Sequence, residues 1–370
     1  MSASAYLHKA FLLAGKAQAK NIRPNPFVGA LVVSKDGQVL GEGYHQKAGE
    51  AHAEVMAINN AIEHGADLST CTLYVSLEPC SHSGKTPPCT DLIIHHRIPK
   101  VVIGSMDPNP LVSGANRLRE KGIAVEVHAL PEIMELNDTF NINQLLKRPK
   151  YIMKSAITLN GNIADRFGNS KWLSGAESRE YVHRHLRTAA DAILTSAKTV
   201  IKDNASMNIR IPGQDAEELS VVVVDRNLDL LKDEHKNLSL FYKRKASKIY
   251  LVTDQISNPV QRDDVEILTI PMIEGSFDIA SLNQALLSRN ICQVLIEAGG
   301  TLNATMMQAK SVDEIYAFVC PGILTDNRSI GMFNSNQEQK MENLVPLTLV
   351  DASVIGQDVL LYYKKLPFPV

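Results

Sequence analysis

The feature that most constrains this chain is a set of side chains suited to metal binding between residues 52 and 89. His52 is followed two residues later by Glu54, and Cys80 and Cys89 come farther along the chain. One imidazole and two thiolates are ligand types that Zn²⁺ prefers, and three protein ligands leave the fourth tetrahedral position free for water. The pattern predicts a catalytic zinc ion bound by His52, Cys80 and Cys89, with Glu54 beside it to move protons.

The spacing of these residues is typical of zinc deaminases. Their signature is H-x-E followed by P-C-x-x-C; here the two cysteines lie nine residues apart instead of three, so the loop between them is longer. Zn²⁺ lowers the pKa of bound water to about 7, which makes hydroxide available to attack an amino-bearing ring carbon. Glu54 would carry the proton to the ring nitrogen and the departing amine, an effect worth roughly 10²–10⁴ in rate. A structural zinc ion with His82 or His45 as fourth ligand is the alternative, although it leaves Glu54 without a role.

Composition favours a two-domain protein that acts on a small substrate. The chain has 370 residues, of which 45% are hydrophobic, enough for two cores of ordinary size. Its 38 basic and 40 acidic residues give a net charge of −2, whereas a protein that grips a phosphate backbone shows an excess of Lys and Arg. We therefore expect a small anionic substrate and no nucleic acid.

The cysteines and the N-terminal segment indicate a reducing compartment. Five cysteines in a long chain are not a disulfide framework. We see no signal peptide and no apolar run long enough to span a membrane. We expect a cytoplasmic protein without a membrane partner, in which Cys80 and Cys89 stay available as thiolates.

Hydrophobic periodicity predicts strands that alternate with helices, an α/β pattern, on both sides of a hinge. The polar run 141–149 is interpreted as this hinge, which gives expected domains 1–147 and 148–370, and 327–342 is expected to be a loop. In the first half we expect helices at 4–20, 50–62 and 90–96 and strands at 27–33, 39–44, 72–77, 101–105 and 123–127. In the second half we expect helices at 176–189, 279–288 and 302–308 and strands at 151–158, 192–196, 220–225, 248–253, 265–270, 292–297, 314–320, 347–354 and 359–363. Both parts of the metal site then fall where a strand gives way to a helix, which is where open α/β sheets build their sites.

Several motifs of the first half resemble those of one enzyme family. They are Asn25-Pro26, Gly41-Glu42-Gly43-Tyr44-His45, His52-Ala53-Glu54, the run Glu78-Pro79-Cys80-Ser81-His82-Ser83-Gly84-Lys85-Thr86-Pro87-Pro88-Cys89, and Asp107-Pro108-Asn109-Pro110. This set is similar to the bifunctional riboflavin-biosynthesis deaminase/reductase family. The long loop between the cysteines separates that family from other zinc deaminases.

The resemblance implies a cytidine-deaminase-like three-layer α/β/α domain that binds one zinc ion. It also implies that the amino group belongs to 2,5-diamino-6-ribosylamino-4(3H)-pyrimidinone 5′-phosphate. By the same carry-over, Asn25, His45 and Lys85 would face this substrate. Taken alone, these three would be interpreted as a turn residue, a surface histidine and a solvated loop lysine.

The residues of the second half give weaker signals by themselves. Gly299-Gly300-Thr301 follows an expected strand and precedes an expected helix, so its N–H groups could bind a phosphate. It is not the G-x-G-x-x-G fingerprint, and a Rossmann domain is not indicated. Arg187, Arg210 and Arg226 could each bind a phosphate, although most arginines only contact solvent.

The resemblance extends to this half and implies a dihydrofolate-reductase-like α/β domain. That domain would use NADPH to reduce the ribosyl group of the deaminated product to ribityl. The implied substrate residues are Lys154, Ser170, Arg187, Met207, Arg210 and Glu297, with Arg187 and Arg210 on the 5′-phosphate. The implied cofactor residues are Ala156, Trp172, Thr199, Asp203, Arg226, Gly299, Gly300, Thr301 and Leu302, with Arg226 on the 2′-phosphate. Homo-oligomers are also implied.

One motif departs from the family pattern. Where the family often has Leu-Asp-Gly after the first strand of this half, the chain has Leu159-Asn160-Gly161, which keeps the turn chemistry but loses a charge. The sequence thus predicts a bifunctional zinc deaminase and NADPH-dependent reductase. Two competing interpretations are a single-function nucleobase or nucleoside deaminase with a non-catalytic second domain, and a binding module in which zinc is structural.

Overall fold

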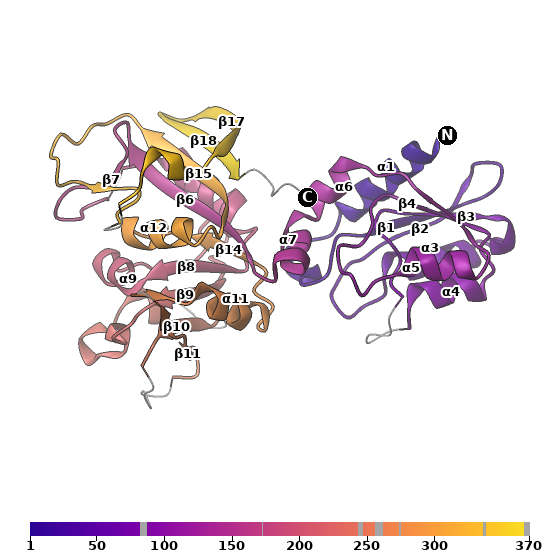
Figure 1. The fold of residues 1–370 in the computed structure, drawn as a ribbon, viewed down its shortest axis with the longest axis horizontal. Helices are drawn as coiled ribbons and strands as arrows, with labels where there is room; N and C mark the ends of the chain where they lie inside the picture. The colour runs from indigo at the N-terminus through magenta and orange to yellow at the C-terminus, as the bar shows by residue number, and fades with distance from the viewer. Residues whose placement is uncertain are drawn as a thin grey trace. The chain divides into compact units, whose positions relative to one another are not determined.

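The chain forms two compact units that meet between Lys147 and Arg148. The computed structural model describes residues 1–81, 87–171, 173–242, 247–255, 262–273, 275–335 and 338–365. Each unit is built on its own central sheet (Figure 1). Among the described residues, no helix is both long and apolar enough to cross a membrane.

The first unit is organised around a five-stranded sheet of order β2-β1-β3-β4-β5. Its strands are β1 Gly29–Val33, β2 Val39–Tyr44, β3 Thr72–Val75, β4 Lys100–Ile103 and β5 Ala124–Val127. β1 and β2 form an antiparallel hairpin around Gly37, whose φ of 84° is readily adopted only by glycine. β1 is also antiparallel to β3, whereas β3, β4 and β5 run parallel to one another.

Helices cover both faces of this sheet. They are α1 Ala3–Ala14, α2 Ala19–Ile22, α3 Ala53–Glu63, α4 Cys89–His95, α5 Gly114–Glu120, α6 Pro131–Leu136 and α7 Asp138–Leu146. Buried residues of α3, α4 and α5 pack on Ala30 and Val32, while α1 packs on Leu31 and Val33. Because successive strand residues face opposite sides, the unit has three layers, α/β/α, as predicted (Figure 1).

The second unit contains a nine-stranded sheet of order β11-β10-β9-β8-β14-β6-β15-β18-β17. Its strands are β6 Lys150–Thr158, β8 Ala192–Ser196, β9 Ser220–Val224, β10 Ile249–Thr253, β11 Val265–Thr269, β14 Gln293–Ile296, β15 Val312–Cys320, β17 Leu347–Ile355 and β18 Asp358–Lys365. The first seven in spatial order are parallel, and β18 is antiparallel to both β15 and β17. Two short pairs lie outside this sheet, β7 Asn162–Ala164 with β16 Ile330–Gly331 and β12 Met272–Ile273 with β13 Ser276–Phe277.

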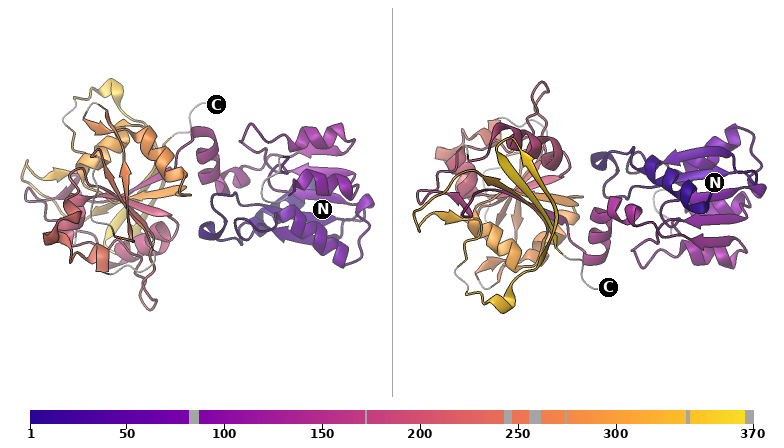
Figure 2. Two further views of the ribbon diagram at one scale, coloured as in Figure 1. Left: turned by 90° about the horizontal axis from the view of Figure 1, so that it is seen from below. Right: turned by 90° about the horizontal axis from the view of Figure 1, so that it is seen from above.

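Both faces of the larger sheet are also covered (Figure 2). The helices are α8 Ala176–Tyr181, which continues as a π-helix at Val182–Arg187, then α9 Ala197–Asp203, α10 Ser239–Tyr242, α11 Ile279–Leu287 and α12 Gly300–Gln308. α11 and α12 bury Leu286 and Met306 against one face. α9 and the π-helix bury Val200 and Leu186 against the other.

The first strand of the second unit is anchored by buried ion pairs. Arg148 donates from Nη1 and Nη2 to the two carboxylate oxygens of Asp313, at 2.7 and 2.6 Å, and the N–H of Tyr151 donates to the same carboxylate. Lys150 Nζ lies 2.8 Å from Glu314 Oε1. The register of β15 on β6 shifts between Val312 and Glu314. The irregularity therefore falls at Asp313, the residue that binds Arg148.

Four sequence expectations need correction. The run 141–149 is not an open hinge, because its residues up to Leu146 belong to α7. The break is confined to Lys147, which has a left-handed backbone with φ 52°. The single helix expected at 4–20 is α1 followed by α2, and the one expected at 176–189 changes from α to π. The loop expected at 327–342 includes β16 and a 3₁₀ turn at Met341–Asn343.

Candidate functional site

The start of α3 presents His52 and Glu54 on one side of the smaller sheet. His52 is the N-cap of the helix, and Glu54 lies in its first turn with only 4% of its surface exposed. Glycines of β2 let this helix approach closely: a Cβ on Gly41 would lie 2.2 Å from the carbonyl oxygen of Ala57. Substitution there would push α3, and with it His52, away from the sheet.

The two cysteines complete the expected metal-binding group. Cys80 follows β3, and Cys89 is the first residue of α4. The Nδ1 atom of His52 lies 3.7 Å from Cys80 Sγ and 3.3 Å from Cys89 Sγ, and all three ligand atoms lie within 4.8 Å of one another. The backbone N–H of Cys89 donates to Cys80 Sγ at 3.2 Å, which stabilises a thiolate. The donors fit a tetrahedral Zn²⁺ site with one open position.

The titrating groups around this point also suit a metal ion. The Cys89 thiol donates to Cys80 Sγ, which lowers the pKa of Cys80 to about 4 and raises that of Cys89. A cation that replaces the shared proton would bind both sulfurs as thiolates. Burial raises the pKa of Glu54 to about 6. A carboxyl group that titrates near neutral pH can both accept and return a proton.

Two of the residues expected to bind substrate meet beside the metal ligands. Asn25 Nδ2 lies 3.0 Å from His45 Nε2, and His45 Nδ1 lies 3.2 Å from the carbonyl oxygen of Ala51. Since a carbonyl can only accept, we assign the proton to Nδ1, and Nε2 accepts from Asn25. The His45 ring stands edge-on to that of His52, with 5.6 Å between centroids. Burial lowers the pKa of His45, which favours this neutral form.

The alternative of a structural zinc ion finds no fourth ligand at His45. Both ring nitrogens of His45 already have partners within the protein. In the described part of the chain, the group that could hold a metal consists of His52, Cys80 and Cys89. His82, the other candidate for a fourth ligand, and Lys85, expected to bind substrate, lie outside the described residues.

Sequence reasoning gave no role to Glu78, which the structure buries next to the metal loop. Its side chain accepts from the N–H of Ala115 at 2.8 Å and from that of Asp107 at 3.3 Å. It thereby joins the residues before Cys80 to two other loops. Its place in the chain, just before Pro79-Cys80, was the available signal, because a carboxylate between a strand and a ligand often fixes the ligand loop.

In the second unit, the residues expected to bind cofactor follow adjacent parallel strands. β9, β8, β14 and β6 are neighbours in the sheet and run in the same direction, so their carboxyl ends share one edge. Ala156 lies near the end of β6, Thr199 and Asp203 lie in α9 after β8, and Arg226 follows β9. Gly299, Gly300, Thr301 and Leu302 follow β14 and begin α12. This edge is where α/β sheets bind their ligands.

The two glycines at the start of α12 differ in the space around them. A Cβ on Gly299 would meet nothing within 4 Å, whereas one on Gly300 would lie 2.5 Å from the carbonyl oxygen of Gly331. Open space beside the first turn of a helix suits a phosphate. Arg226, by contrast, is held by Asp254 through Nε at 3.2 Å and Nη2 at 3.1 Å. Trp172 lies outside the described residues.

Two of the charged residues expected to bind substrate, Arg187 and Glu297, form an ion pair with each other. Arg187 donates from Nε and Nη2 to the carboxylate of Glu297 at 2.7 and 2.8 Å, and from Nη1 to the carbonyl oxygen of Asn208 at 2.5 Å. The pKa of Glu297 is lowered to about 2: its burial works in the opposite direction, but Arg187 and the nearby Lys154 outweigh it. Burial lowers the pKa of Lys154.

His183 also belongs to this cluster. Like Glu78 in the first unit, it was not singled out from the sequence. It lies in the π-helix four residues before Arg187, and its Nδ1 accepts from the N–H of Arg210 at 2.9 Å. Burial is the main reason that its pKa falls to about 3, and Arg187 adds to the effect. The Arg210 side chain is exposed and donates to Asn208 Oδ1 at 2.6 Å. Met207 packs into the core beneath them.

Ser170 lies in the wall of a cavity of about 630 Å³. The residues after β15, Pro321–Leu324, form part of the same wall. Asn160 binds this segment from across the sheet end: its Nδ2 donates to the carbonyl oxygen of Leu324 at 2.7 Å, and its Oδ1 accepts from the N–H of Leu324 at 3.3 Å. An Asp could accept here but could not make the donation.

Comparison with known proteins agrees with both halves of this description. The model of the RibD C-terminal domain matches residues 149–361, and that of the cytidine and deoxycytidylate deaminase zinc-binding region matches residues 1–105. The riboflavin biosynthesis protein RibD of Actinobacillus pleuropneumoniae is 35% identical over 367 residues, which cover 97% of this chain and 94% of that protein. RibD of Aquifex aeolicus is 33% identical and is covered to 98%.

A solved structure from Thermotoga maritima has the same fold. It is a diaminohydroxyphosphoribosylaminopyrimidine deaminase/5-amino-6-(5-phosphoribosylamino)uracil reductase, 33% identical, with a TM-score of 0.82 over 98% of both chains. The predicted family, fold class and pairing of two activities are thus confirmed. The chain belongs to the RibD family of riboflavin-biosynthesis proteins and joins a zinc-dependent deaminase domain to a reductase domain.

Proposed function

We propose that residues 1–147 deaminate 2,5-diamino-6-ribosylamino-4(3H)-pyrimidinone 5′-phosphate and that residues 148–370 reduce the ribosyl group of the product to ribityl. The observation that carries the first step is the convergence of His52, Cys80 and Cys89, with Glu54 buried beside them. The substrate follows from the activity named for the Thermotoga maritima relative.

In the deaminase half, His52, Cys80 and Cys89 hold the zinc ion. When bound, this ion supplies a water molecule activated at neutral pH. Glu54 would accept one proton from the attacking water and pass it to the ring nitrogen, and would then accept the remaining hydroxyl proton and pass it to the leaving amine. This double role suits a buried carboxyl group whose pKa is raised to about 6. Asn25 and His45 orient the pyrimidine beside the metal ligands, and Lys85 contacts the same substrate.

In the reductase half, NADPH supplies the hydride when bound. Ala156, Thr199, Asp203 and Arg226 belong to the edge that would hold it, together with the first turn of α12, Gly299 to Leu302. The family resemblance assigns Trp172 to the same cofactor. The residues proposed to bind the substrate of this half are Lys154, Ser170, Arg187, Met207, Arg210 and Glu297. Because Arg187 is bound to Glu297, a 5′-phosphate would have to compete with that carboxylate for the guanidinium.

We also propose that the enzyme works in the cytoplasm on a free small molecule and assembles with copies of itself. All five cysteines are free thiols, and the metal site needs two of them reduced. The edge strand β17 exposes Leu349 and Val354, apolar side chains that a second copy could cover. Light scattering after size-exclusion chromatography measures the oligomeric state.

A coupled assay tests the assignment of both steps. Purified protein with one zinc per chain receives the diaminopyrimidine phosphate and NADPH, and ammonia release and NADPH absorbance are followed together. We expect ammonia first and NADPH oxidation after it. Removal of zinc with a chelator should abolish ammonia release, and addition of zinc should restore it. Reduction of the deaminated product, when this compound is supplied ready-made (the pre-made uracil), should not change. Ammonia release without NADPH oxidation would instead support a single-function deaminase.

A further inference from the structure

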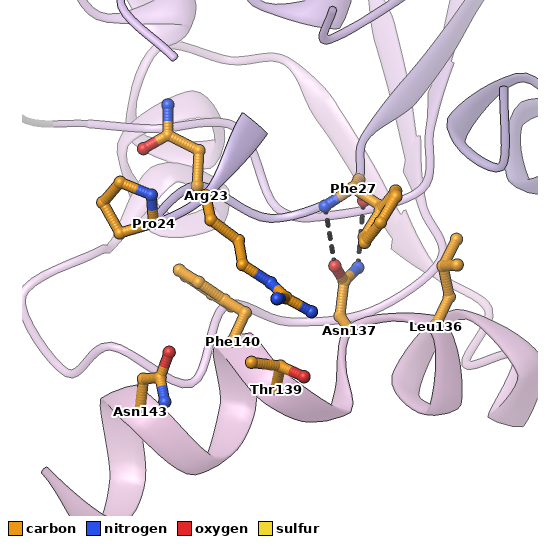
Figure 3. A pocket seen from close by; sticks show the side chains of 9 residues that line it. Arg23, Pro24, Phe27, Leu136, Asn137, Thr139, Phe140 and Asn143 are labelled. Carbon is orange, nitrogen blue, oxygen red and sulfur yellow. Dashed lines mark hydrogen bonds between the residues drawn. The ribbon is translucent and has the colours of Figure 1, made fainter. Parts of the chain in front are cut away.

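A side chain distant from the metal ligands in the sequence, Asn137, holds the loop that carries Asn25. Asn137 lies between α6 and α7 and is 2% exposed. Its Oδ1 accepts from the N–H of Phe27 at 2.7 Å, and its Nδ2 donates to the carbonyl oxygen of Phe27 at 2.9 Å (Figure 3). The amide therefore pairs with one backbone residue in both directions, as a neighbouring strand would.

The loop from Arg23 to Phe27 has few backbone partners of its own. Pro24 and Pro26 have no N–H, and the N–H groups of Arg23 and Asn25 bond to the carbonyl oxygens of Ala19 and Ile22. The remaining N–H, that of Phe27, is the one that Asn137 binds. Loss of the amide would leave both polar groups of Phe27 to find new partners, which a packed loop can do only by moving.

Little space is available for such a partner. The loop and the residues around Asn137 line a small, partly open pocket of about 10 Å³, which Phe140 and Asn143 also line (Figure 3). That volume holds one water molecule at most, so in the intact protein the two polar groups of Phe27 bond to the amide of Asn137.

A series of contacts leads from this loop to the metal ligands. Phe27 is two residues from Asn25, whose amide lies 3.0 Å from His45 Nε2. The ring of His45 in turn stands against that of His52. A displacement of Phe27 would therefore move Asn25 relative to His45, and with it the surface offered to the pyrimidine.

We propose that Asn137 is a positioning residue of the deaminase half, which acts through the Phe27 backbone to hold Asn25 and His45 in place for the pyrimidine. This inference rests on the proposed function, because it assumes that Asn25 and His45 bind the substrate. It assigns to a helix junction 110 residues away in the chain a role in substrate affinity.

The test compares four proteins: wild type, Asn137→Ala, Asn137→Asp and the matched control Asn141→Ala. Asn141 lies in α7, one turn after Asn137, and its amide donates to the carbonyl oxygen of Met134 instead of to the loop. For Asn137→Ala we expect the KM of deamination to rise about tenfold with a smaller change in kcat. Asn137→Asp keeps the acceptor for Phe27 and should give an intermediate KM, while Asn141→Ala should match wild type.

Zinc content and reduction of the pre-made uracil by the same proteins show whether the chain is folded. A variant that merely unfolds would lose zinc and kcat with an unchanged KM, and this result would overturn the proposal. In the double variant Asn25→Ala/Asn137→Ala, the rise in KM should be smaller than the product of the two single effects, because Asn137 acts in part through Asn25. Multiplied effects, or an unchanged KM in Asn137→Ala, would also refute it. Failure of wild type to release ammonia would instead refute the proposed function.

Discussion

The two halves of the chain prepare their sites in different ways. In the deaminase half the metal ligands are already within 4.8 Å of one another, and they lie on the first residues of two helices and the loop after β3. In the reductase half two of the arginines expected to bind phosphates are paired with carboxylates, Arg187 with Glu297 and Arg226 with Asp254. The metal ligands are thus already brought together without the ion, whereas a phosphate would have to exchange with a carboxylate.

The largest expected effect concerns proton transfer in the deaminase half. Glu54→Ala should lower the rate of ammonia release by roughly 10²–10⁴, the usual value of a placed acid/base. Zinc content should stay near one per chain, since Glu54 is not one of the three ligand residues. Reduction of the pre-made uracil by the same protein should be unchanged. Undiminished ammonia release would show that Glu54 does not transfer protons. The deaminase half would then lose the acid/base group that distinguishes it from the reductase half.

The paired cations of the reductase half can be tested through Arg187. Arg187→Ala leaves Glu297 charged and buried, and we expect the second unit to lose about 3–5 kcal/mol of unfolding free energy. Reduction should be lost as well, while deamination persists at temperatures where the first unit is folded. Urea unfolding of the full chain measures the difference. Arg184→Ala is the matched control, because its exposed pair with Glu180 contributes only about 0.3–0.5 kcal/mol.

Low pH should reduce the stability of the second unit. The pKa of His183 falls from 6.5 to about 3 and that of Glu297 from 4.5 to about 2, so the unfolded chain binds these protons before the folded unit does. The stability of the second unit should therefore be greatest above pH 6.5 and decline as pH falls toward 2. Unfolding midpoints measured across this range test it. His183→Asn should flatten the part between pH 6.5 and 4.5, and an unchanged profile would contradict the assignment.

The smallest expected effect concerns the turn that departs from the family pattern. Asn160→Asp would lose the hydrogen bond to the carbonyl oxygen of Leu324 at a cost of about 0.5–1.5 kcal/mol. We expect a modest rise in the KM of reduction, because Leu324 lines the cavity that also contains Ser170. Asn290→Asp, which adds the same charge at an exposed turn, is the control. A faster reductase would show that the carboxylate has a chemical role that this chain has given up.

The sequence predicted what short-range chemistry determines. Buried apolar runs marked the strands, and β2 and β8 have the predicted bounds. One histidine and two cysteines at the family spacing predicted a metal site because this pattern has few other uses, and the structure brings the three side chains together. The polar run 141–149 was misread because α7 buries few side chains, so composition resembled a loop although the backbone is helical.

What the sequence could not reveal depends on contacts between distant residues. Asn137 and Phe27 are 110 residues apart, and no local pattern marks an asparagine that replaces a strand partner. Likewise, nothing in the neighbourhood of Arg187 in the sequence shows that Glu297, also 110 residues away, neutralises it. The roles given to individual reductase residues stay predictions for this reason.

The anchor of Arg148 on Asp313 has a consequence for dividing the gene. A second half expressed alone from residue 148 would keep Arg148, whose guanidinium neutralises Asp313. A second half that begins at Lys150 would lack Arg148 and would have to fold with Asp313 missing this partner. Two polypeptides that differ by two residues should then differ in solubility and yield. The position at which this enzyme could be divided into two separate polypeptides is thus set by the ion pair of Arg148 with Asp313 and not by a flexible linker.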